Sequence, residues 1–264
     1  MRSRIAELAD LLQPGDVHVW QADLSSMRML GDAALHTLSA DERLRADGYM
    51  FESDRERFIL RRYMLRRLIG TYLDTPPEAV RFRYGPAGKP DVAAETECAI
   101  RFSLSRSHSV VLCVLARERD VGVDVERVCA DVPTEVIDRF FSPREAAAFL
   151  RHPASWQREA FYACWTRKEA YLKAAGRSVT ELNSIDMSVS PLLCSMTIPA
   201  MDGIGSDPSW RLQDLRTYEG YRAALVVSDP MDVSGPFDWC DVDNFEASAL
   251  DGERYGIQRS SACH

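Results

Sequence analysis

Two carboxylates lie two residues apart in the segment 121–126, VGVDVE. A β-strand sends alternate side chains to opposite faces, so the three valines would share one face and Asp124 and Glu126 the other. Hard oxygen ligands at this separation suit Mg²⁺, which takes one or two carboxylates and completes its octahedron with water and phosphate oxygens. The alternative is an ordinary amphipathic strand with a solvated acidic face, and the D-x-E pattern alone favours that alternative.

A second group of polar residues lies in the segment 165–176, WTRKEAYLKAAG, which has the pattern of a helix ended by Gly176. Trp165, Glu169 and Lys173 are spaced four residues apart and would share one helix face. The alternative is an exposed Glu-to-Lys pair worth about 0.2–0.5 kcal/mol, with the tryptophan in the core. Taken alone, the segment again favours that alternative.

Basic residues gather in two further places. One helical segment carries six arginines among apolar residues: Arg55, Arg57, Arg61, Arg62, Arg66 and Arg67. Lys89 in a G-K-P turn and the polar run 103–109, SLSRSHS, add donors suited to phosphate. The arginines could instead extend around an amphipathic stripe, and His108 alone is more often a solvent-facing histidine. We expect one or two of the arginines to bind a ligand.

Composition narrows the class of protein. The 264 residues are 46% hydrophobic and 27% charged, which is typical of a globular protein, and the net charge of -8 disfavours nonspecific nucleic-acid binding. Seven scattered cysteines without a C-x-x-C pair argue against zinc and against a disulfide framework. The longest apolar run, 110–116, is far shorter than the roughly 20 residues that cross a bilayer. Because Glu7 and Asp10 interrupt any secretory signal, we expect a cytoplasmic protein.

The order of expected elements is similar in the two halves of the chain. In the first half, the sequence predicts a strand at 17–24 and then two helices that begin near Ser39 and Asp54. Further strands are predicted at 80–84, 100–104 and 110–116. In the second half, the sequence predicts a strand at 121–126 and then helices at 133–150 and 155–175. Strands follow at 185–189, 210–217 and 221–228. This order predicts an α+β fold of two pseudo-symmetric subdomains, residues 1–118 and 119–228, with the active site in the cleft between them.

The last segment, residues 229–264, has a different composition. It carries eight acidic residues against two arginines, a net charge of 2 - 8 = -6, and little apolar periodicity. Such a composition predicts a loosely ordered acidic tail. We expect the active site to lie outside it.

The order of the motifs decides between the alternatives. Between about Asp54 and Val189 the chain contains G-K-P, F-x-L-S-x-S, V-G-V-D-V-E, R-F-F-S-x-x-E and W-x-x-K-E-A-x-x-K-x-x-G. This order resembles the Sfp-type 4′-phosphopantetheinyl transferases. The resemblance implies a magnesium enzyme, with Mn²⁺ also admitted, that moves phosphopantetheine from coenzyme A to a serine of an apo acyl or peptidyl carrier protein and releases 3′,5′-ADP.

The resemblance also implies roles for individual residues. Asp124, Glu126 and Glu169 would hold the metal, and Glu169 would accept the proton of the attacking serine, directly or through water. Lys168 and Lys173 would stabilise the phosphates, with Lys173 the acid toward the leaving group. We take Glu169, Lys173 and Asp124 as the catalytic residues.

Further residues are implied to bind the coenzyme or its metal. Arg57 and Lys89 would bind the nucleotide end of coenzyme A. Glu145, in the R-F-F-S-x-x-E motif, matches a glutamate near the water shell of the metal.

The chain departs from the family pattern in two places. In F-N-[LI]-S-H-S the family has a histidine that contacts the 3′-phosphate, but here Arg106 follows Ser105. Arginine can bind a phosphate bidentately at every physiological pH. A small shift of the loop would instead let His108 supply the motif, so both residues stay candidates. Ser105 of the same motif is also expected to contact the coenzyme. After the catalytic helix, Arg177 stands where the family has leucine.

The resemblance favours a monomer that binds coenzyme A in the cleft, with the carrier protein docked across it on a locally apolar or basic surface. The runner-up is a catalytically silent protein of the same fold that binds coenzyme A or the carrier, and the presence of all three carboxylates argues against it. An RNA-binding domain built on the arginine-rich helix is disfavoured because no stacking motif accompanies that helix.

Overall fold

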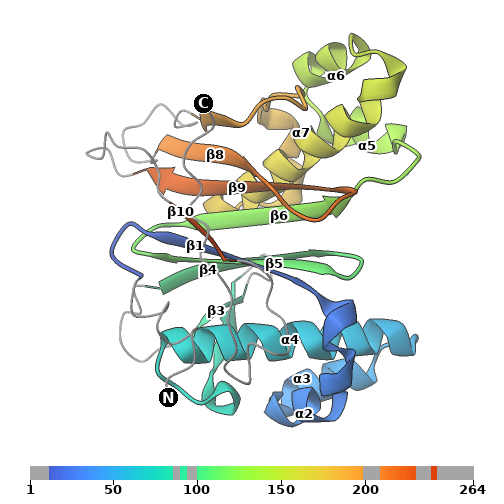
Figure 1. Cartoon of the computed structure of the whole chain (residues 1–264). Helices are drawn as coiled ribbons and strands as arrows, with labels where there is room; N and C mark the ends of the chain where they lie inside the picture. The colour runs from blue at the N-terminus through green and yellow to red at the C-terminus, as the bar shows by residue number, and fades with distance from the viewer. Residues whose placement is uncertain (1–11, 86–89, 94–99, 199–208, 230–238, 243–264) are drawn as a thin grey trace.

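The computed structural model describes residues 12–85, 90–93, 100–198, 209–229 and 239–242. In these parts of the chain, two sheets lie face to face between two long helices (Figure 1). Helix α4 (Glu52–Tyr72) covers the outer face of one sheet, and helix α7 (Ala154–Ala175) covers the outer face of the other. A third apolar core, rich in valine, fills the space between the sheets. The molecule is therefore layered as helix, sheet, sheet and helix.

The first sheet has the order β10-β1-β5-β4 and the second the order β6-β9-β8-β7. The strands of the first sheet are β1 (Val17–Asp23), β4 (Ile100–Ser107), β5 (Val110–Arg117) and β10 (Trp239–Val242). Those of the second are β6 (Val121–Arg127), β7 (Ser195–Ile198), β8 (Ser209–Leu215) and β9 (Tyr221–Asp229). A small hairpin pairs β2 (Phe82–Tyr84) with β3 (Pro90–Val92). In each sheet the strand that carries a predicted motif, β4 or β6, lies at an edge.

Shorter helices complete the two halves. They are η1 (Leu24–Leu30), α2 (Gly31–Thr37), α3 (Ala40–Asp47), η2 (Pro77–Ala79), α5 (Thr134–Phe140), α6 (Pro143–Leu150) and η3 (Val179–Ser184). Helix α3 begins at the predicted cap, where Ser39 and Glu42 form a capping box. Helix α7 ends as expected at Gly176, whose φ of 65° is the left-handed conformation that glycine adopts at low cost. No helix in the described ranges is long and apolar enough to span a membrane.

Three expectations are corrected by the structure. The predicted helical stretch 133–150 is two helices, because Ser142 caps a new helix that Pro143 begins. Residues 185–189 form no strand, because the backbone N–H of Met187 donates to the Glu145 side chain (2.6 Å) instead of a neighbouring strand. The strand in this part of the chain is β7.

The third correction concerns the acidic tail. Residues 239–242 form β10, which pairs in parallel with β1 in the register Val17↔Trp239 to Trp20↔Val242. One edge of β1 is taken by β5, and β10 takes the other. The sheet of the first half therefore contains a strand from beyond residue 228. Residues 230–238 and 243–264 of the predicted tail lie outside the described residues.

Candidate active site

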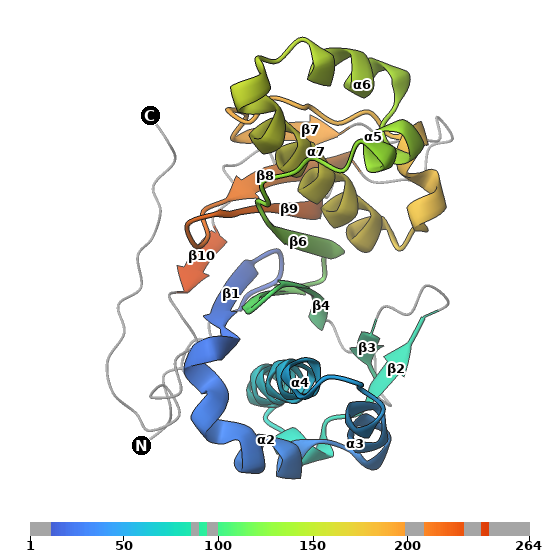
Figure 2. The ribbon, with the colours of Figure 1, turned by 90° about the vertical axis from the view of Figure 1, so that its right-hand side faces the viewer.

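The two sheets meet along an edge where β4 lies beside β6 (Figure 2). One edge of β6 pairs with β9, which leaves alternate N–H groups on its other edge without a strand partner. Serine hydroxyl oxygens of β4 accept hydrogen bonds from these N–H groups. Ser103 accepts from Val123 (3.1 Å), Ser105 from Val125 (3.3 Å) and Ser107 from Arg127 (3.0 Å). We call Ser103, Ser105 and Ser107 the serine ladder. It joins the two halves in place of a continuous sheet.

The carboxylates of β6 share one face, as the alternation predicts. The valines of β6 point into the core between the sheets, and Asp124 and Glu126 point to the opposite side. The serine ladder contacts both carboxylates: Ser105 Oγ donates to Asp124 Oδ1 and Ser107 Oγ donates to Glu126 Oε2, each at 2.7 Å. Asp124 is 3% exposed, and its buried Oδ2 has no hydrogen-bond partner in the described structure.

Helix α7 lies against this same face of β6. Gly122 permits the close approach, since a Cβ there would lie 2.0 Å from Ala170 O and 2.3 Å from Ala174 N. The approach brings Lys173 to Asp124, with Nζ 2.6 Å from Oδ1 and 3.1 Å from Ser105 Oγ. The residues from β6 and α7 that were predicted to act together are therefore adjacent.

The third carboxylate, Glu169, belongs to this cluster electrostatically. Burial raises the pKa of Glu169, the negative charges of Asp124 and Glu126 raise it further, and the Lys173 ammonium opposes them. Burial also raises the pKa of Glu126, against the hydrogen bond from Ser107. A cation placed among the three carboxylates would relieve the repulsion between their charged forms.

The donor set fits a hard divalent cation. Asp124, Glu126 and Glu169 offer only carboxylate oxygens, the ligand type that Mg²⁺ and Mn²⁺ prefer, and Asp124 Oδ2 is left without a partner. Within the described residues no three Asp, Glu, His or Cys side chains are grouped tightly enough to hold a metal ion. Holding a metal with all three therefore requires their side chains to converge further.

Positive charge gathers beside the carboxylates, at the tip of the β4–β5 hairpin. His108 forms this tip with a left-handed φ of 54°, and its pKa is lowered by burial and then by Arg127, Arg57 and Arg106. Arg106 also acts on Arg61, whose pKa falls to about 10, chiefly through burial. Several like charges gathered in this way form an environment that favours an anion.

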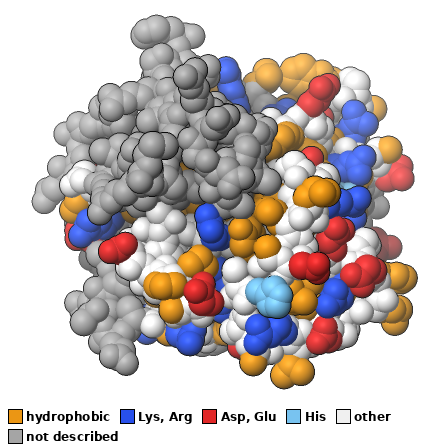
Figure 3. All heavy atoms as spheres, turned by 60° about the horizontal axis from the view of Figure 1, so that its bottom comes forward, with side chains coloured by type: hydrophobic (Ala, Val, Ile, Leu, Met, Phe, Trp, Pro, Cys, Tyr) orange, Lys and Arg blue, Asp and Glu red, His pale blue; other side chains and the backbone are white. Residues whose placement is uncertain are grey.

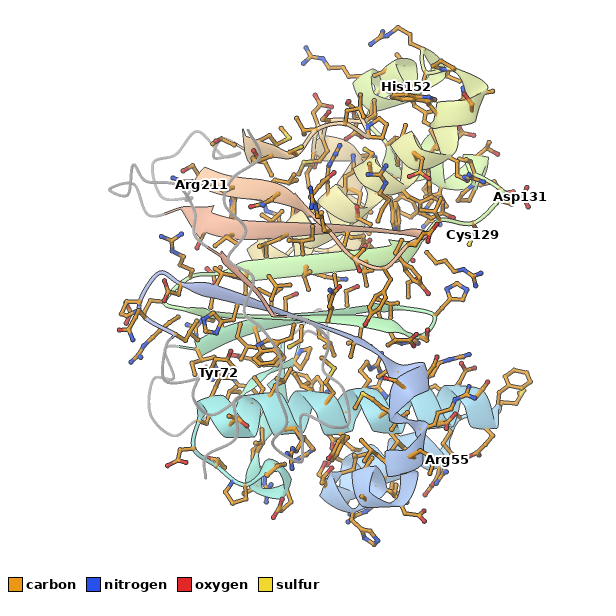
Figure 4. The ribbon with its side chains drawn as sticks, in the orientation of Figure 1. Arg55, Tyr72, Cys129, Asp131, His152 and Arg211 are labelled. Atoms are coloured by element: carbon orange, nitrogen blue, oxygen red, sulfur yellow. The ribbon has the colours of Figure 1, made fainter. Side chains whose placement is uncertain are left out.

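The hairpin tip lies on the side of the molecule where α4 begins and β6 ends. Arg55, near the start of α4, and Cys129 and Asp131, which follow β6, are on this side in Figure 4, whereas Tyr72, at the end of α4, is on the other. The Nε atom of Arg61 is buried without a hydrogen-bond partner in the described structure. Arg57 acts on His108 and Arg106 acts on Arg61, so cationic groups of α4 face the hairpin.

Most other arginines of α4 are neutralised within the protein. Glu42 Oε2 accepts from Arg66 Nε (2.6 Å), and Glu42 Oε1 lies 2.9 Å from Arg62 Nε. Arg55 pairs with Asp47 and Glu52. Figure 3 shows basic and acidic side chains mixed with hydrophobic ones on the face it presents. Within the described residues, helix α4 therefore presents no continuous basic surface.

A cavity of about 390 Å³ adjoins the carboxylates. Phe102 and Leu104 of β4 line it from one half of the molecule, and Glu169, Lys173 and Val179 line it from the other. Glu169 and Lys173 thus border a space large enough for part of a small-molecule ligand.

Comparison with known proteins identifies the family. The model of the 4′-phosphopantetheinyl transferase superfamily matches residues 120–226, and that of the N-terminal region of 4′-phosphopantetheinyl transferases matches residues 20–120. The 4′-phosphopantetheinyl transferase HetI of Nostoc is 33% identical over 216 residues, which cover 81% of this chain and 88% of HetI. The chain belongs to the 4′-phosphopantetheinyl transferase superfamily.

More distant relatives carry the same activity in their names. The 4′-phosphopantetheinyl transferase of Bacillus subtilis is 24% identical over 80% of this chain and 88% of its own length. The human L-aminoadipate-semialdehyde dehydrogenase-phosphopantetheinyl transferase is 24% identical over 75% of this chain and 69% of its own length. The resemblance inferred from the motifs is confirmed, and this transferase is an enzyme.

In this phosphopantetheinyl transferase, two residues predicted to belong to the site, Lys168 and Glu145, lie in the core and pair with each other. The Lys168 side chain is 0% exposed, and its ammonium donates to Glu145 and to Ile185 O (2.8 Å). Glu145 also accepts from the backbone N–H groups of Ser142 and Met187. The structure therefore corrects the predictions that Lys168 binds phosphate and that Glu145 lies near the metal: both residues stabilise the fold instead.

The other predicted binding residues are distributed as follows. Arg57 lies beside the hairpin tip, where it also pairs with Asp54 (3.0 Å). Arg106 and His108 both lie at this tip, so the structure brings the two candidates together. The hydroxyl of Ser105, predicted to contact the coenzyme, contacts Asp124 and Lys173. Lys89 lies outside the described residues.

Sequence reasoning missed the roles of several residues. The serines of the ladder were considered only as phosphate donors, although their period of two matches the period of the carboxylates on β6. That shared period was a usable signal. No sequence signal separated Arg61 from the other five arginines of its helix or marked Arg127, because the significance of both depends on the folded position of the hairpin tip.

Proposed function

We propose that this transferase moves the 4′-phosphopantetheine group from coenzyme A to a serine hydroxyl of an apo acyl or peptidyl carrier protein, with Mg²⁺ or Mn²⁺, and releases 3′,5′-ADP. The observation that carries the proposal is the meeting of Asp124 and Glu126 of β6 with Glu169 and Lys173 of α7. Their position beside the arginines that surround the hairpin tip, Arg57, Arg106 and Arg127, supports a polyanionic donor.

In the proposed reaction, the carrier serine Oγ bonds to the phosphorus that bears the pantetheine arm, and the bond from that phosphorus to the bridging oxygen of the pyrophosphate breaks. The electron pair leaves with 3′,5′-ADP. Mg²⁺, when bound, supplies charge neutralisation at the pyrophosphate oxygens. Asp124, Glu126 and Glu169 would hold it there, so that most of the catalysis is electrostatic placement.

Glu169 is proposed as the proton acceptor for the carrier serine, directly or through one water. Its raised pKa makes it a stronger base than an ordinary glutamate, and it borders the cavity. Lys173 is proposed to stabilise the charge that develops on the leaving pyrophosphate and to donate a proton to it. With an exposed fraction of 29%, its side chain is accessible to a substrate in the cavity.

The coenzyme is proposed to bind in the cleft between two pseudo-symmetric halves, with its nucleotide phosphates toward Arg57, Arg106 and His108. The carrier would dock across the same cleft, where exposed Val179 offers an apolar contact. We further propose that the protein acts as a cytoplasmic monomer.

The test is intact-mass spectrometry of an apo carrier protein after incubation with this protein, coenzyme A and Mg²⁺. We expect the carrier to gain the phosphopantetheine mass, and the gain to disappear with Glu169→Ala or with EDTA. A protein that binds coenzyme A but leaves a panel of carriers unmodified would instead be the catalytically silent binder.

A further inference from the structure

The serine ladder does more than join the halves, because two of its members also donate to the carboxylates. Each ladder oxygen accepts a backbone N–H of β6, and an N–H group can only donate. The single hydroxyl proton therefore stays available for another acceptor. For Ser105 that acceptor is Asp124 Oδ1, and for Ser107 it is Glu126 Oε2.

The contacts of Ser107 leave its hydroxyl little freedom. Its Oγ accepts from Arg127 N at 3.0 Å and donates to Glu126 Oε2 at 2.7 Å, whereas His108 Nδ1 is farther away at 3.5 Å. The side chain is buried, with 7% exposed. Glu126 has more rotatable bonds than an aspartate and is only partly buried. The hydrogen bond from Ser107, which belongs to the other half of the protein, therefore restricts its side chain.

Ser105 is held in the same way and has one further contact. Its Oγ accepts from Val125 N and from Lys173 Nζ (3.1 Å) while it donates to Asp124. The third member, Ser103, accepts from Val123 N, but the residue of β6 beside it on the carboxylate face is Gly122, which has no side chain to hold. Ser103 thus makes the structural contact of the ladder without the contact to a carboxylate.

We infer that Ser107, through Glu126, and Ser105, through Asp124, are positioning residues that set the carboxylate oxygens for a divalent cation. This inference rests on the proposed metal-dependent function. Groups that hydrogen-bond to metal ligands fix their orientation, and loss of such a group costs about 10–100-fold in metal affinity or activity. The N-terminal half would in this way control a metal site whose ligands all lie in the C-terminal half.

The test compares Ser107→Ala with Ser103→Ala in the full-length protein. Each variant loses one ladder contact to β6, but only Ser107→Ala loses a contact to a carboxylate. Binding of Mn²⁺ alone, without coenzyme or carrier, is measured by electron paramagnetic resonance, and thermal unfolding is measured for each variant. Ser107→Thr, which keeps the hydroxyl and suits a strand, serves as the rescue variant.

We expect the Mn²⁺ dissociation constant to rise about 10–100-fold in Ser107→Ala, to stay at the wild-type value in Ser103→Ala, and to recover in Ser107→Thr. In the transfer assay, the Mg²⁺ concentration for half-maximal activity should rise in Ser107→Ala more than the rate at saturating Mg²⁺ falls. Equal weakening in both alanine variants, or none in either, would overturn the inference.

Failure of the proposed function gives a different result. Asp124→Asn is the control that assigns Mn²⁺ binding to this site, because it removes a proposed ligand. If the wild-type protein binds no Mn²⁺, or Asp124→Asn binds it equally well, the proposed metal site itself is wrong. If the wild type binds Mn²⁺ at this site and Ser107→Ala binds it as tightly, only the positioning role is wrong.

Discussion

Lys173 Nζ lies 2.6 Å from Asp124 Oδ1 and thereby joins the last turn of α7 to the middle of β6. The aspartate side chain is 4% exposed and the lysine side chain 29%, so the pair lies at the boundary between the core and the cavity. A charge-assisted hydrogen bond in such a place is stronger than one at the surface. Lys173 therefore neutralises a proposed metal ligand, and in the proposed reaction it would also stay within reach of a substrate phosphate.

Replacement of Lys173 by methionine should reduce catalysis more than substrate binding. The variant keeps the aliphatic stem but loses the charge proposed to stabilise the leaving pyrophosphate. We expect kcat to fall about 10²–10³-fold, the range for loss of one group that stabilises transition-state charge. Steady-state kinetics with coenzyme A and an apo carrier measure this effect, and an unchanged kcat would exclude Lys173 from the proposed chemistry.

The neighbouring lysine should behave differently, because Lys168 and Glu145 form a buried pair. Lys168→Met leaves the Glu145 charge buried without its partner, which is expected to cost about 3–5 kcal/mol of unfolding free energy. The double variant Lys168→Met/Glu145→Gln removes both charges and should regain part of that loss. Urea denaturation of the three proteins measures the difference. Full stability in the single variant would contradict the structural role assigned to this pair.

The raised pKa of Glu169 predicts a pH dependence of stability in the metal-free protein. When the pKa of a carboxyl is higher in the folded than in the unfolded protein, the free energy of unfolding falls as the pH rises through the interval between the two pKa values. Glu169→Gln removes that loss. With EDTA present, the stability of the variant relative to the wild type should therefore be greatest at pH 7. This margin should shrink as the pH falls through that interval and stop changing below the ordinary glutamate pKa.

Urea unfolding at several pH values measures this margin. Glu181→Gln is the matched control, because Glu181 lies outside the carboxylate cluster and pairs with Arg177 on the surface. A Glu169→Gln margin that is independent of pH would show that the neighbouring charges do not act on Glu169 as described.

The group of cations at the hairpin tip predicts how the coenzyme is bound. Arg106→Ala should raise the KM for coenzyme A about 10-fold or more with a smaller change in kcat, because the 3′-phosphate that Arg106 is proposed to contact lies away from the reacting bond. Arg101→Ala on the same strand, where Arg101 pairs with Asp120 at 3.8 Å, is the charge control. His108→Ala tests the alternative residue, and a KM effect in His108→Ala alone would assign the phosphate contact to the histidine.

Periodicity was sufficient to predict the faces of the site but not its surroundings. A period of two placed Asp124 and Glu126 together, and a spacing of four placed Glu169 and Lys173 together, because these periods are properties of strands and helices themselves. Lys168 is next to Glu169 in the sequence, but successive side chains of a helix point about 100° apart. The Lys168 side chain therefore points into the core, and no local sequence pattern predicts this burial. The motif alone therefore could not separate a structural lysine from a catalytic one.

Long-range contacts explain the other differences between prediction and structure. The strand β10 is four residues long, and it is stabilised by β1 from the opposite end of the sequence. Its pairing could not be predicted from the composition of the segment 229–264, which is that of an acidic tail. The serine ladder likewise depends on two strands that are separated by the β5 strand in the sequence, and only the folded structure shows that they are adjacent.

The closest approach of α7 to β6 gives a last prediction, at Gly122. An alanine there would place its Cβ 2.0 Å from Ala170 O and 2.3 Å from Ala174 N, so the helix would have to move away from the strand. Overpacking of this kind costs about 1–3 kcal/mol and occasionally more. The same movement would separate Lys173 from Asp124, so activity should fall further than the loss of folded protein explains.

The matched control for this change is Gly31→Ala. Gly31 begins helix α2, has a φ of -46° and has no atom within 4 Å of an added Cβ, so the same substitution should change stability little. Denaturation and transfer kinetics of both variants test the pair. If Gly122→Ala were as stable and active as Gly31→Ala, the packing of α7 on β6 would not be what holds Glu169 and Lys173 at the carboxylates. We expect instead that Gly122→Ala alone loses both properties.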